Sequence, residues 1–394
     1  PKNFLFQLQP FIAARDYHLL AHANKAICPQ GNFGNDVFEV QPYNEVPVLF
    51  IKVPGCSFHP DPDWYYNFHY VLEQYRGQEY VEDLFTYGKF ECTLQQGDKL
   101  FITLSLNNPL SENAAAKWEK EIKRREKIIS AAEGNFVQTL QLAADQFLVK
   151  RPDGSETIIA GYHWFTDWGR DAMISLPGLC FTTGKEKIAK NIIRHFLHYL
   201  SQGMIPNRFP DYGKPPEYNT VDATLWLVLT AYYYYHQTKD INFVREELFP
   251  AIKEIINAYT QGTRYHIKVM EDGLLFAGEP GEQLTWMDAK INDWVVTART
   301  GKAVEINALW YNVLKVYSYF LQEAGQKRMV AFYEKKAAAM QQQFIAAFWN
   351  QEKQCLYDVV NDDAKDDSIR PNQLLAVSLP FPLITGRQAG KILK

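Results

Sequence analysis

The sequence lacks the patterns that mark several common classes of protein. Its 394 residues hold five cysteines, an odd number without a CxxC pair, so neither a disulfide framework nor a zinc site is indicated. No apolar run reaches membrane-spanning length, and no charged-then-apolar leader opens the chain. Basic and acidic residues number 41 and 45 without a basic run, which argues against nucleic acid as a partner. We expect a cytoplasmic protein with neither a membrane nor a nucleic-acid partner.

Motifs for several catalytic chemistries are also missing. The sequence has no phosphate-binding glycine-rich loop and no G-x-S-x-G elbow. His195 and His198 are spaced i, i+3 on an expected helix, but no HExxH motif or third ligand accompanies them. We therefore predict structural or surface histidines and no metal site.

Aromatic residues, by contrast, are abundant: 23 Tyr, 25 Phe and 9 Trp, too many to serve only one site, so most must lie in the core. Residues 161–171 (GYHWFTDWGRD) combine aromatic rings with two carboxylates, a histidine and an arginine. Aromatic faces stack on the C–H faces of sugar rings, and Arg and Asp form directional hydrogen bonds to hydroxyls. This mixture favours a carbohydrate site.

The first part of the chain reads as β-strands. Residues 46–53 form an apolar run, residues 90–94 alternate, and residues 100–106 place apolar side chains on one face. Gly97 and Asp98 form a turn signal that predicts a hairpin between the last two strands. We expect an antiparallel β-sandwich over residues 1–110.

Residues 111–133 change in character, because they are rich in Ala, Glu, Lys and Arg. This composition predicts a linker helix with a solvated charged face, and Ser111 is the candidate N-cap. From residue 134 onward apolar residues recur at helical spacing, most clearly over residues 306–321 and 188–200. Further helices are predicted near residues 136–148, 171–183, 222–237, 243–260, 327–349 and 372–379.

Three polar and aromatic loops each run into the start of a predicted helix, where they place Asp171, Asp222 and Glu305. A carboxylate at a helix N-terminus has an ordinary explanation, because it caps free N–H groups and meets the positive end of the dipole. For any one of the three, capping and a site role are equally good interpretations. If inner and outer helices alternate in a ring, however, all three loops face one cleft.

A fourth loop, residues 274–289, contains glycines that let the backbone approach a ligand. Trp286 and Met287 place apolar surface next to Asp288, and partial burial of a carboxyl favours the protonated form that a general acid requires. The alternative is that Asp288 caps a helix or turn, which spacing alone slightly favours.

Five motifs, in this order, resemble the amylo-α-1,6-glucosidase domain of glycogen debranching enzymes. They are residues 162–172 (YHWFTDWGRDA), 203–207 (GMIPN), 218–223 (YNTVDA), 284–289 (LTWMDA) and 301–311 (GKAVEINALWY). Residues 80–85 (YVEDLF) resemble the β-domain that precedes it in bacterial and archaeal members.

The resemblance implies an N-terminal antiparallel β-sandwich (1–110), a linker helix (111–133) and an (α/α)6 toroid (134–394). It also implies hydrolysis of α-1,6-linked glucose in a branched α-glucan with inversion, and no metal or organic cofactor.

The resemblance also implies roles for individual residues. Asp288 matches the general acid, while Arg170 and Asp171 match the pair that holds hydroxyls of the terminal glucose. The stacking walls would be Trp164, Trp168 and Trp286. The remaining subsite residues would be Asn207, Asn219, Asp222, Lys302, Glu305 and Asn307.

The end of the chain departs from the family pattern. Inversion requires a second carboxylate as base, and in the family it lies near the C-terminus, after the region of residues 370–373 (RPNQ). Here Asp171, Asp222 and Glu305 do not match it. We therefore expect the base beyond residue 394 and a toroid without its last helices. Two alternatives stay open: another exo-α-glycosidase of the toroid class, glucoamylase-like or trehalase-like, and a non-catalytic α-glucan-binding protein.

Overall fold

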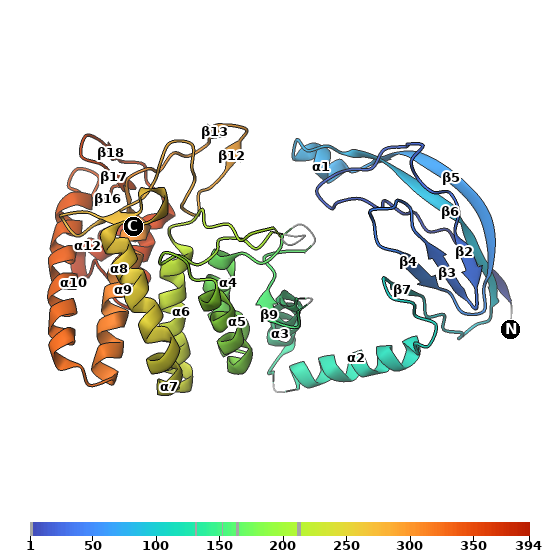
Figure 1. Cartoon of the computed structure of the whole chain (residues 1–394), viewed down its shortest axis with the longest axis horizontal. Coiled ribbons are helices and arrows are strands. Elements are labelled where there is room, and N and C mark those ends of the chain that lie inside the picture. The colour runs from blue at the N-terminus through green and yellow to red at the C-terminus, as the bar shows by residue number, and fades with distance from the viewer. Residues whose placement is uncertain (1–2, 131, 152, 163–164, 211–213) are drawn as a thin grey trace. The chain divides into compact units, whose positions relative to one another are not determined.

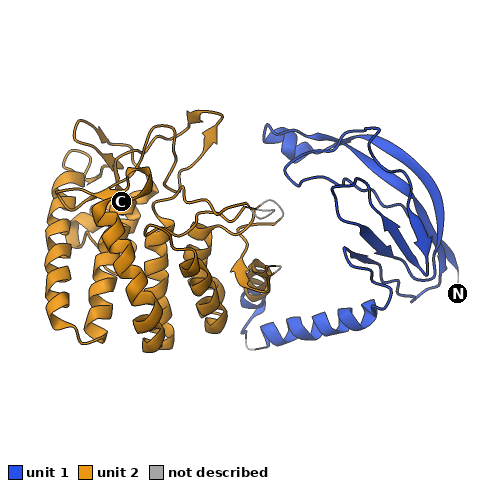
Figure 2. Cartoon of the chain, in the orientation of Figure 1, with its two compact units in different colours: residues 1–138 blue, residues 139–394 orange. Residues whose placement is uncertain are grey.

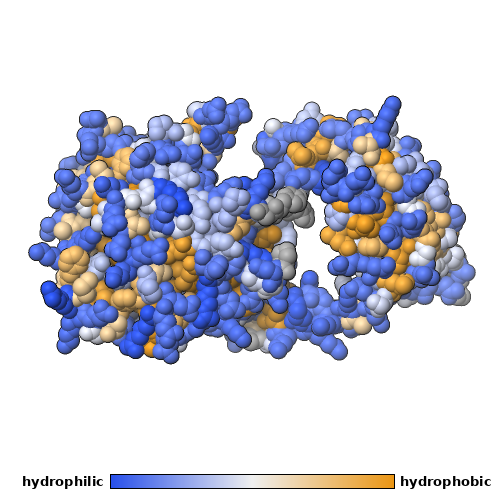
Figure 3. Space-filling view, viewed as in Figure 1, coloured by the Kyte–Doolittle hydropathy of each residue, from blue (hydrophilic) through white to orange (hydrophobic). Residues whose placement is uncertain are grey.

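The computed structural model describes residues 3–130, 132–151, 153–162, 165–210 and 214–394. The chain forms two compact units, Pro1–Gln138 and Thr139–Lys394, coloured separately in Figure 2. The first is rich in antiparallel strands and the second in helices, which confirms the predicted mixture of β and α structure. The face shown in Figure 3 is mostly hydrophilic, with hydrophobic patches on both units. Within the described residues, no helix has the length and apolarity needed to cross a membrane.

Unit 1 contains two antiparallel sheets, with strand orders β1-β6-β5 and β2-β3-β4-β7. The strands are β1 Phe4–Leu8, β2 Asn32–Gly34, β3 Val37–Val40, β4 Leu49–Lys52, β5 Ser57–His69, β6 Val81–Leu94 and β7 Thr103–Ser105. Aromatic side chains from both sheets share one core, in which the Phe38 ring lies 4.5 Å from that of Phe58 and 6.0 Å from that of Phe90.

The predicted hairpin around Gly97 and Asp98 is wrong. Strand β6 pairs with β1 and β5, whereas β7 pairs with β4 through Ile51 and Leu104. The turn itself is present, since Asp98 accepts a hydrogen bond from Gln95 N at 2.7 Å. A turn signal reports a local reversal of the chain, and here the reversal carries the chain from one sheet to the other.

Two helices belong to unit 1, α1 Val71–Tyr75 and α2 Ala114–Ile129. Asn113, not the predicted Ser111, caps α2, because its side chain accepts a hydrogen bond from Ala116 N at 3.0 Å. Helix α2 has no buried residue. Its charges therefore stay solvated, as the composition predicted.

The helices predicted for the second half of the chain are confirmed, and a final one, α12, was not predicted. They are α3 Asn135–Phe147, α4 Gly169–Leu176, α5 Glu186–His198, α6 Ala223–Thr238, α7 Ile241–Phe243, α8 Phe249–Gln261, α9 Val304–Glu323, α10 Lys327–Phe348, α11 Leu375–Ser378 and α12 Gly386–Ile392. Short π or 3-10 segments are Pro177–Phe181, Val244–Leu248, Arg264–His266 and Pro371–Leu374.

Short antiparallel strand pairs lie in the connections between these helices. They are β8 Leu148–Lys150, β9 Glu156–Ile158, β10 Lys268–Val269, β11 Leu275–Phe276, β12 Lys290–Ile291, β13 Trp294–Val295, β14 Lys302–Ala303, β15 Trp349–Asn350, β16 Cys355–Leu356, β17 Val359–Val360 and β18 Lys365–Asp366. Sheet β14-β17-β18 joins the loop before α9 to the segment after α10.

Inner and outer helices alternate along unit 2. Helices α4, α6, α9 and α11 contact one another in chain order, while α5 packs on α6, and α8 and α10 pack on α9. The upright helices stand side by side in Figure 1. Helix α9 is buried along most of its length, with Trp310 fully enclosed. The loops that lead into α4, α6 and α9 gather at one end of the unit, where their residues line one pocket.

Candidate active site

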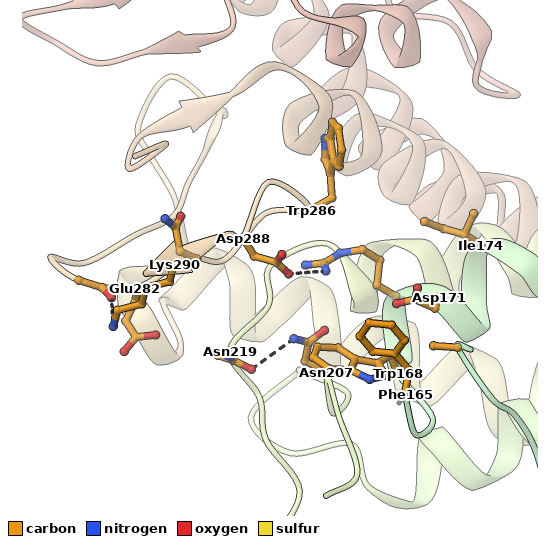
Figure 4. Close-up of a pocket in the computed structure, with 14 residues that line it drawn as sticks. Phe165, Trp168, Asp171, Ile174, Asn207, Asn219, Glu282, Trp286, Asp288 and Lys290 are labelled. Atoms are coloured by element: carbon orange, nitrogen blue, oxygen red, sulfur yellow. Dashed lines mark hydrogen bonds and ion pairs between the residues drawn. The ribbon is translucent and has the colours of Figure 1, made fainter. Parts of the chain in front are cut away.

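A pocket of about 760 Å³ opens where the loops before α4, α6 and α9 meet. This volume lies within the range of small-molecule sites. Its lining residues are Ala160, Phe165, Trp168, Arg170, Asp171, Ile174, Asn207, Asn219, Gly281, Glu282, Gln283, Trp286, Asp288 and Lys290. In Figure 4, Trp286 and Asp288 lie on one wall, and Phe165 and Trp168 on the other.

The start of α4 brings two charged residues to the pocket. Gly169 N donates a hydrogen bond to Asn207 O at 2.7 Å, which fastens the start of α4 to the loop that leads toward α6. A Cβ atom on Gly169 would lie only 2.1 Å from Pro206 O, so only glycine allows this close approach. Arg170 and Asp171 follow directly and line the pocket.

Arg170 is the centre of the site's charge network. Its Nε lies 2.8 and 2.9 Å from the two carboxylate oxygens of Asp222, its Nη1 lies 3.1 Å from Asp288 Oδ2, and its Nη2 donates to Thr220 Oγ1 at 3.2 Å. Burial lowers the pKa of Arg170, but the charges of Asp222 and Asp288 raise it further, so its pKa lies above the ordinary value. The guanidinium is therefore a permanent cation at the pocket floor.

Asp222 occupies the N-cap position of α6 without capping it through its side chain. Its carboxylate instead accepts hydrogen bonds from Arg170 and, at 2.7 Å, from the Thr220 hydroxyl. Of the two interpretations that the sequence left equal, side-chain capping is not observed, and the site role stays a prediction. Asp222 lies behind Arg170, outside the pocket lining.

Asp171 lies in the first turn of α4, with its carboxylate at the pocket wall. Desolvation by the surrounding residues raises the pKa of Asp171, and the nearby charges of Asp288 and Asp222 add to that rise, while Arg170 opposes it. Of the three carboxylates considered as a base, Asp171 is the one that lines the pocket.

Asp288 lies in the loop between α8 and α9, and its carboxylate contacts Arg170. It does not stand at a helix start, because strand β12 follows it two residues later. Its side chain is 41% exposed, so the partial burial expected from Trp286 and Met287 is small. The loop is held beside the α6 loop, since Val221 N donates to Leu284 O at 2.9 Å.

Aromatic walls flank these charges. Trp168 precedes α4, and the Arg208 guanidinium lies 5.6 Å from its ring centre. Trp286 is 48% exposed, and its Nε1 donates to Asn372 Oδ1 at 2.9 Å. Trp164, the third predicted wall residue, lies outside the described residues.

Asn207 and Asn219 add amide groups to the pocket. Asn207 Nδ2 donates to Asn219 Oδ1 at 3.3 Å. Within the described parts of the chain, Asn207 Oδ1 is buried without a hydrogen-bond partner. A buried unpaired acceptor at a pocket wall is suited to a ligand hydroxyl.

Besides Asp222, three predicted site residues do not line the pocket. Lys302 Nζ pairs with Asp272 at 2.7 Å, and Asn307 fastens β11 to α9 by hydrogen bonds to both backbone groups of Leu275. Glu305 is buried and accepts a hydrogen bond from Arg299 Nη2 at 2.6 Å. These side chains hold the loops that carry the pocket.

Seven lining residues were not predicted from the sequence: Ala160, Phe165, Ile174, Gly281, Glu282, Gln283 and Lys290. All seven are in or beside the quoted motifs and loops, so their position there was the available signal. It also missed a buried network behind the pocket, formed by Arg299, Asp358 and Asn372. Within the described residues, His, Cys, Asp and Glu form no cluster suited to a metal ion.

Comparisons with known proteins agree with the resemblance. Residues 142–394 match the family model described as amylo-alpha-1,6-glucosidase, and residues 1–101 match that of the glycogen debranching enzyme N terminal. The glycogen debranching enzyme of Saccharomyces cerevisiae is 28% identical over a match that covers 50% of this chain and 17% of the yeast protein. The chain therefore spans less than a fifth of that relative's length.

A crystal structure of a rhamnosidase of Bacillus sp. GL1 has a TM-score of 0.45 to this chain at 13% sequence identity. The superposition covers 91% of this chain and 38% of the rhamnosidase.

Proposed function

Because the chain belongs to the amylo-alpha-1,6-glucosidase family of glycogen debranching enzymes, we propose that it removes α-1,6-linked glucose from branch points of glycogen-like α-glucans, with inversion. The observation that carries the proposal is one pocket with aromatic walls, a fixed guanidinium and Asp288 together. This combination suits a sugar ring, whose faces are apolar and whose edge is polar.

Asp288 is the general acid in this proposal. It donates a proton to the glycosidic oxygen as the bond from that oxygen to the anomeric carbon breaks. A water molecule adds to the anomeric carbon from the opposite face and gives its proton to a base, so the product is the inverted anomer. Asp288 Oδ2 lies 3.1 Å from Arg170 Nη1, which stabilises the carboxylate that remains after proton donation.

Arg170 and Asp171 bind hydroxyl groups of the terminal glucose. Asp222 and Thr220 fix the Arg170 guanidinium from behind, so it loses little freedom when the sugar binds. Asn207 Oδ1 accepts a further hydroxyl, and its neighbour Asn219 keeps the amide in place.

Trp168 and Trp286 stack on the two faces of the bound sugar. Trp164, which lies outside the described residues, keeps the stacking role that the family resemblance implies. The places of Trp168 and Trp286 in the lining support these roles. For Lys302, Glu305 and Asn307 we propose support of the subsite from behind, since their partners are other protein groups.

The finer architecture is part of the same proposal. The alternating helices of residues 134–394 belong to an (α/α)6 toroid, and the two sheets of residues 1–110 form a β-sandwich joined to it by a linker helix at 111–133. Support comes from the order of inner helices and from the core that the two sheets share. The five cysteines are all free thiols, which supports a cytoplasmic location.

The test is glucose release from a maltooligosaccharide that carries one α-1,6-linked glucosyl stub. If the chain also supplies the base, it should release glucose with β-glucose appearing first by NMR, and Asp288→Asn should lose at least about 100-fold in rate. Asp293→Asn, an exposed change five residues further along the chain, is the matched control and should behave as wild type.

Other outcomes would replace the proposal. Release from trehalose or linear maltooligosaccharides, with the branched substrate left intact, would assign a different α-glycosidase. Tight binding of the branched substrate without hydrolysis by the wild-type chain would indicate a glucan-binding role instead.

A further inference from the structure

Four consecutive side chains of the loop that carries Asp288 are each held by a buried group. Arg299 Nη1 donates to Thr285 Oγ1 at 3.2 Å, and Asn372 contacts the next two residues, Trp286 and Met287. Asp288 itself is held by Arg170. An irregular loop that is fastened at every side chain has a defined geometry rather than a range of conformations.

Asn372 uses both ends of its amide in this arrangement. Its Oδ1 accepts the indole hydrogen bond from Trp286 Nε1 at 2.9 Å. Its Nδ2 donates to Asp358 Oδ1 at 2.7 Å and lies 3.6 Å from Met287 Sδ. Asn372 is 1% exposed, so no water competes for these contacts.

Asp358 anchors the amide in turn. It is buried and receives two hydrogen bonds from Arg299, each of 2.9 Å, and a third from Arg370 Nη1 at 2.6 Å. Glu305, at the start of α9, is a second carboxylate on the same guanidinium and accepts a hydrogen bond from Arg299 Nη2 at 2.6 Å. Burial lowers the pKa of Arg299, but Glu305 and Asp358 raise it above its ordinary value, so the guanidinium stays charged.

If Asn372 served only to stabilise the buried network, it would not need its hydrogen bond to Trp286. The charges of this network are already paired among Arg299, Glu305, Asp358 and Arg370. Trp286, in contrast, is half exposed at the pocket wall and carries little of the core. The bond from a buried amide to an exposed indole therefore fixes the plane of a ring that faces the ligand.

We propose that Asn372 is a positioning residue, which holds the Trp286 ring and the following carboxyl of Asp288 in register with the bound sugar. This inference rests on the proposed function of the pocket. Asn372 touches no reacting atom and acts through the loop of residues 285–288.

The first test requires no substrate. In the full chain labelled with 5-fluorotryptophan, Trp286→Phe identifies the ¹⁹F resonance of Trp286. We expect Asn372→Ala to shift and narrow that resonance because the ring gains freedom. Asn312→Ala is the matched control, since Asn312 is equally buried but binds Ala308 and Phe381. An unchanged Trp286 resonance in Asn372→Ala would overturn the proposal.

The second test measures glucose release from the stub-bearing maltooligosaccharide. We expect Asn372→Ala to lower kcat/KM by on the order of 10- to 100-fold, while Asn312→Ala lowers Tm with kcat/KM within about twofold. Trp286→Phe removes the hydrogen bond between Trp286 and Asn372 by changing its exposed partner instead of its buried one. It replaces Asn372→Ala in this test if that variant folds poorly.

The double variant distinguishes positioning from general damage. If Asn372 acts through the indole, Asn372→Ala adds less than its single effect on kcat/KM when Trp286 is already Phe. Fully additive losses in kcat/KM would refute the proposal that Asn372 acts through the Trp286 indole. Hydrolysis of trehalose or linear maltooligosaccharides, with the branched substrate left intact, would refute the proposed function instead, and the fluorine measurement still decides the role of Asn372.

Discussion

Arg170 and Asp222 form a buried ion pair beneath the pocket, joined by two hydrogen bonds of 2.8 and 2.9 Å to the same guanidinium nitrogen. Neither residue is more than a tenth exposed. A buried charge that loses its partner is expensive, whereas an exposed one is solvated by water. The pair is therefore a stability element as well as a part of the site.

Asp222→Ala should lower the free energy of unfolding by about 3 kcal/mol, because it leaves the buried Arg170 charge with Asp288 as its one remaining salt-bridge partner among the described residues. Urea denaturation measures this. Glu247→Ala is the control, since it breaks the more exposed pair with Arg194 and should cost about 1 kcal/mol or less. Equal losses in the two variants would contradict this account.

Gly169→Ala should disturb both folding and the pocket. The new Cβ meets Pro206 O at 2.1 Å, so the start of α4 must shift, at a cost of about 1–3 kcal/mol. Because Arg170 and Asp171 follow directly, affinity for a maltooligosaccharide should fall as well, as measured by calorimetry. Gly178→Ala, where nothing lies within 4 Å, should change stability by less than about 1 kcal/mol and leave affinity intact.

Ligand binding should weaken in mild acid because of Asp171. Its pKa is raised, so this carboxylate gains a proton at a higher pH than an ordinary aspartate, and it then loses an acceptor for sugar hydroxyls. Affinity for a maltooligosaccharide should therefore decrease as the pH falls through that raised pKa. Asp171→Asn should bind the maltooligosaccharide more weakly at neutral pH, and its affinity should not decrease further over this pH range. A step that persists in the variant would assign the titration to another group.

Unit 1 should lose stability in acid through Glu82. Burial raises the pKa of this carboxyl, but hydrogen bonds from Arg15, Tyr70 and Ala21 N lower it more, so the folded-state pKa lies below the ordinary value. The stabilisation is present above the unfolded-state pKa, about 4.3, and is lost as the pH falls through the lower, folded-state pKa.

Hydrogen exchange of the β6 amides, followed from pH 6 down to about 3, tests this. Glu82→Gln should start with lower protection and show a flatter acid dependence. A slope that equals that of the wild-type chain would exclude Glu82 as the acid-sensitive group.

Local patterns were enough to predict the helices. Apolar spacing located α9 within two residues of its observed ends, and the motif around Arg170 and Asp171 lies at a pocket wall, which makes it a candidate site. The spacing of residues could not predict the role of Asp222, because a helix N-cap and an ion-pair partner can stand at the same sequence position. Only its distance to Arg170, 52 residues earlier in the chain, separates the two roles.

The network behind the pocket was beyond sequence reasoning for a different reason. Arg299 and Asp358 are 59 residues apart, and Trp286 and Asn372 are 86 apart. No periodicity links such positions, so each looks like an ordinary polar residue until the chain is folded. The wrong hairpin at Gly97 has the same origin, since the partner of β7 is β4, far earlier in the chain.

The contact between Arg170 and Asp288 joins residues 118 positions apart. A ribosome that adds about 5–20 residues per second needs roughly 6–24 s to cover that interval. During this time the growing chain already carries one wall of the pocket but not the other. The pocket thus forms late in synthesis, and a nascent chain cannot enclose a ligand there before both walls have emerged.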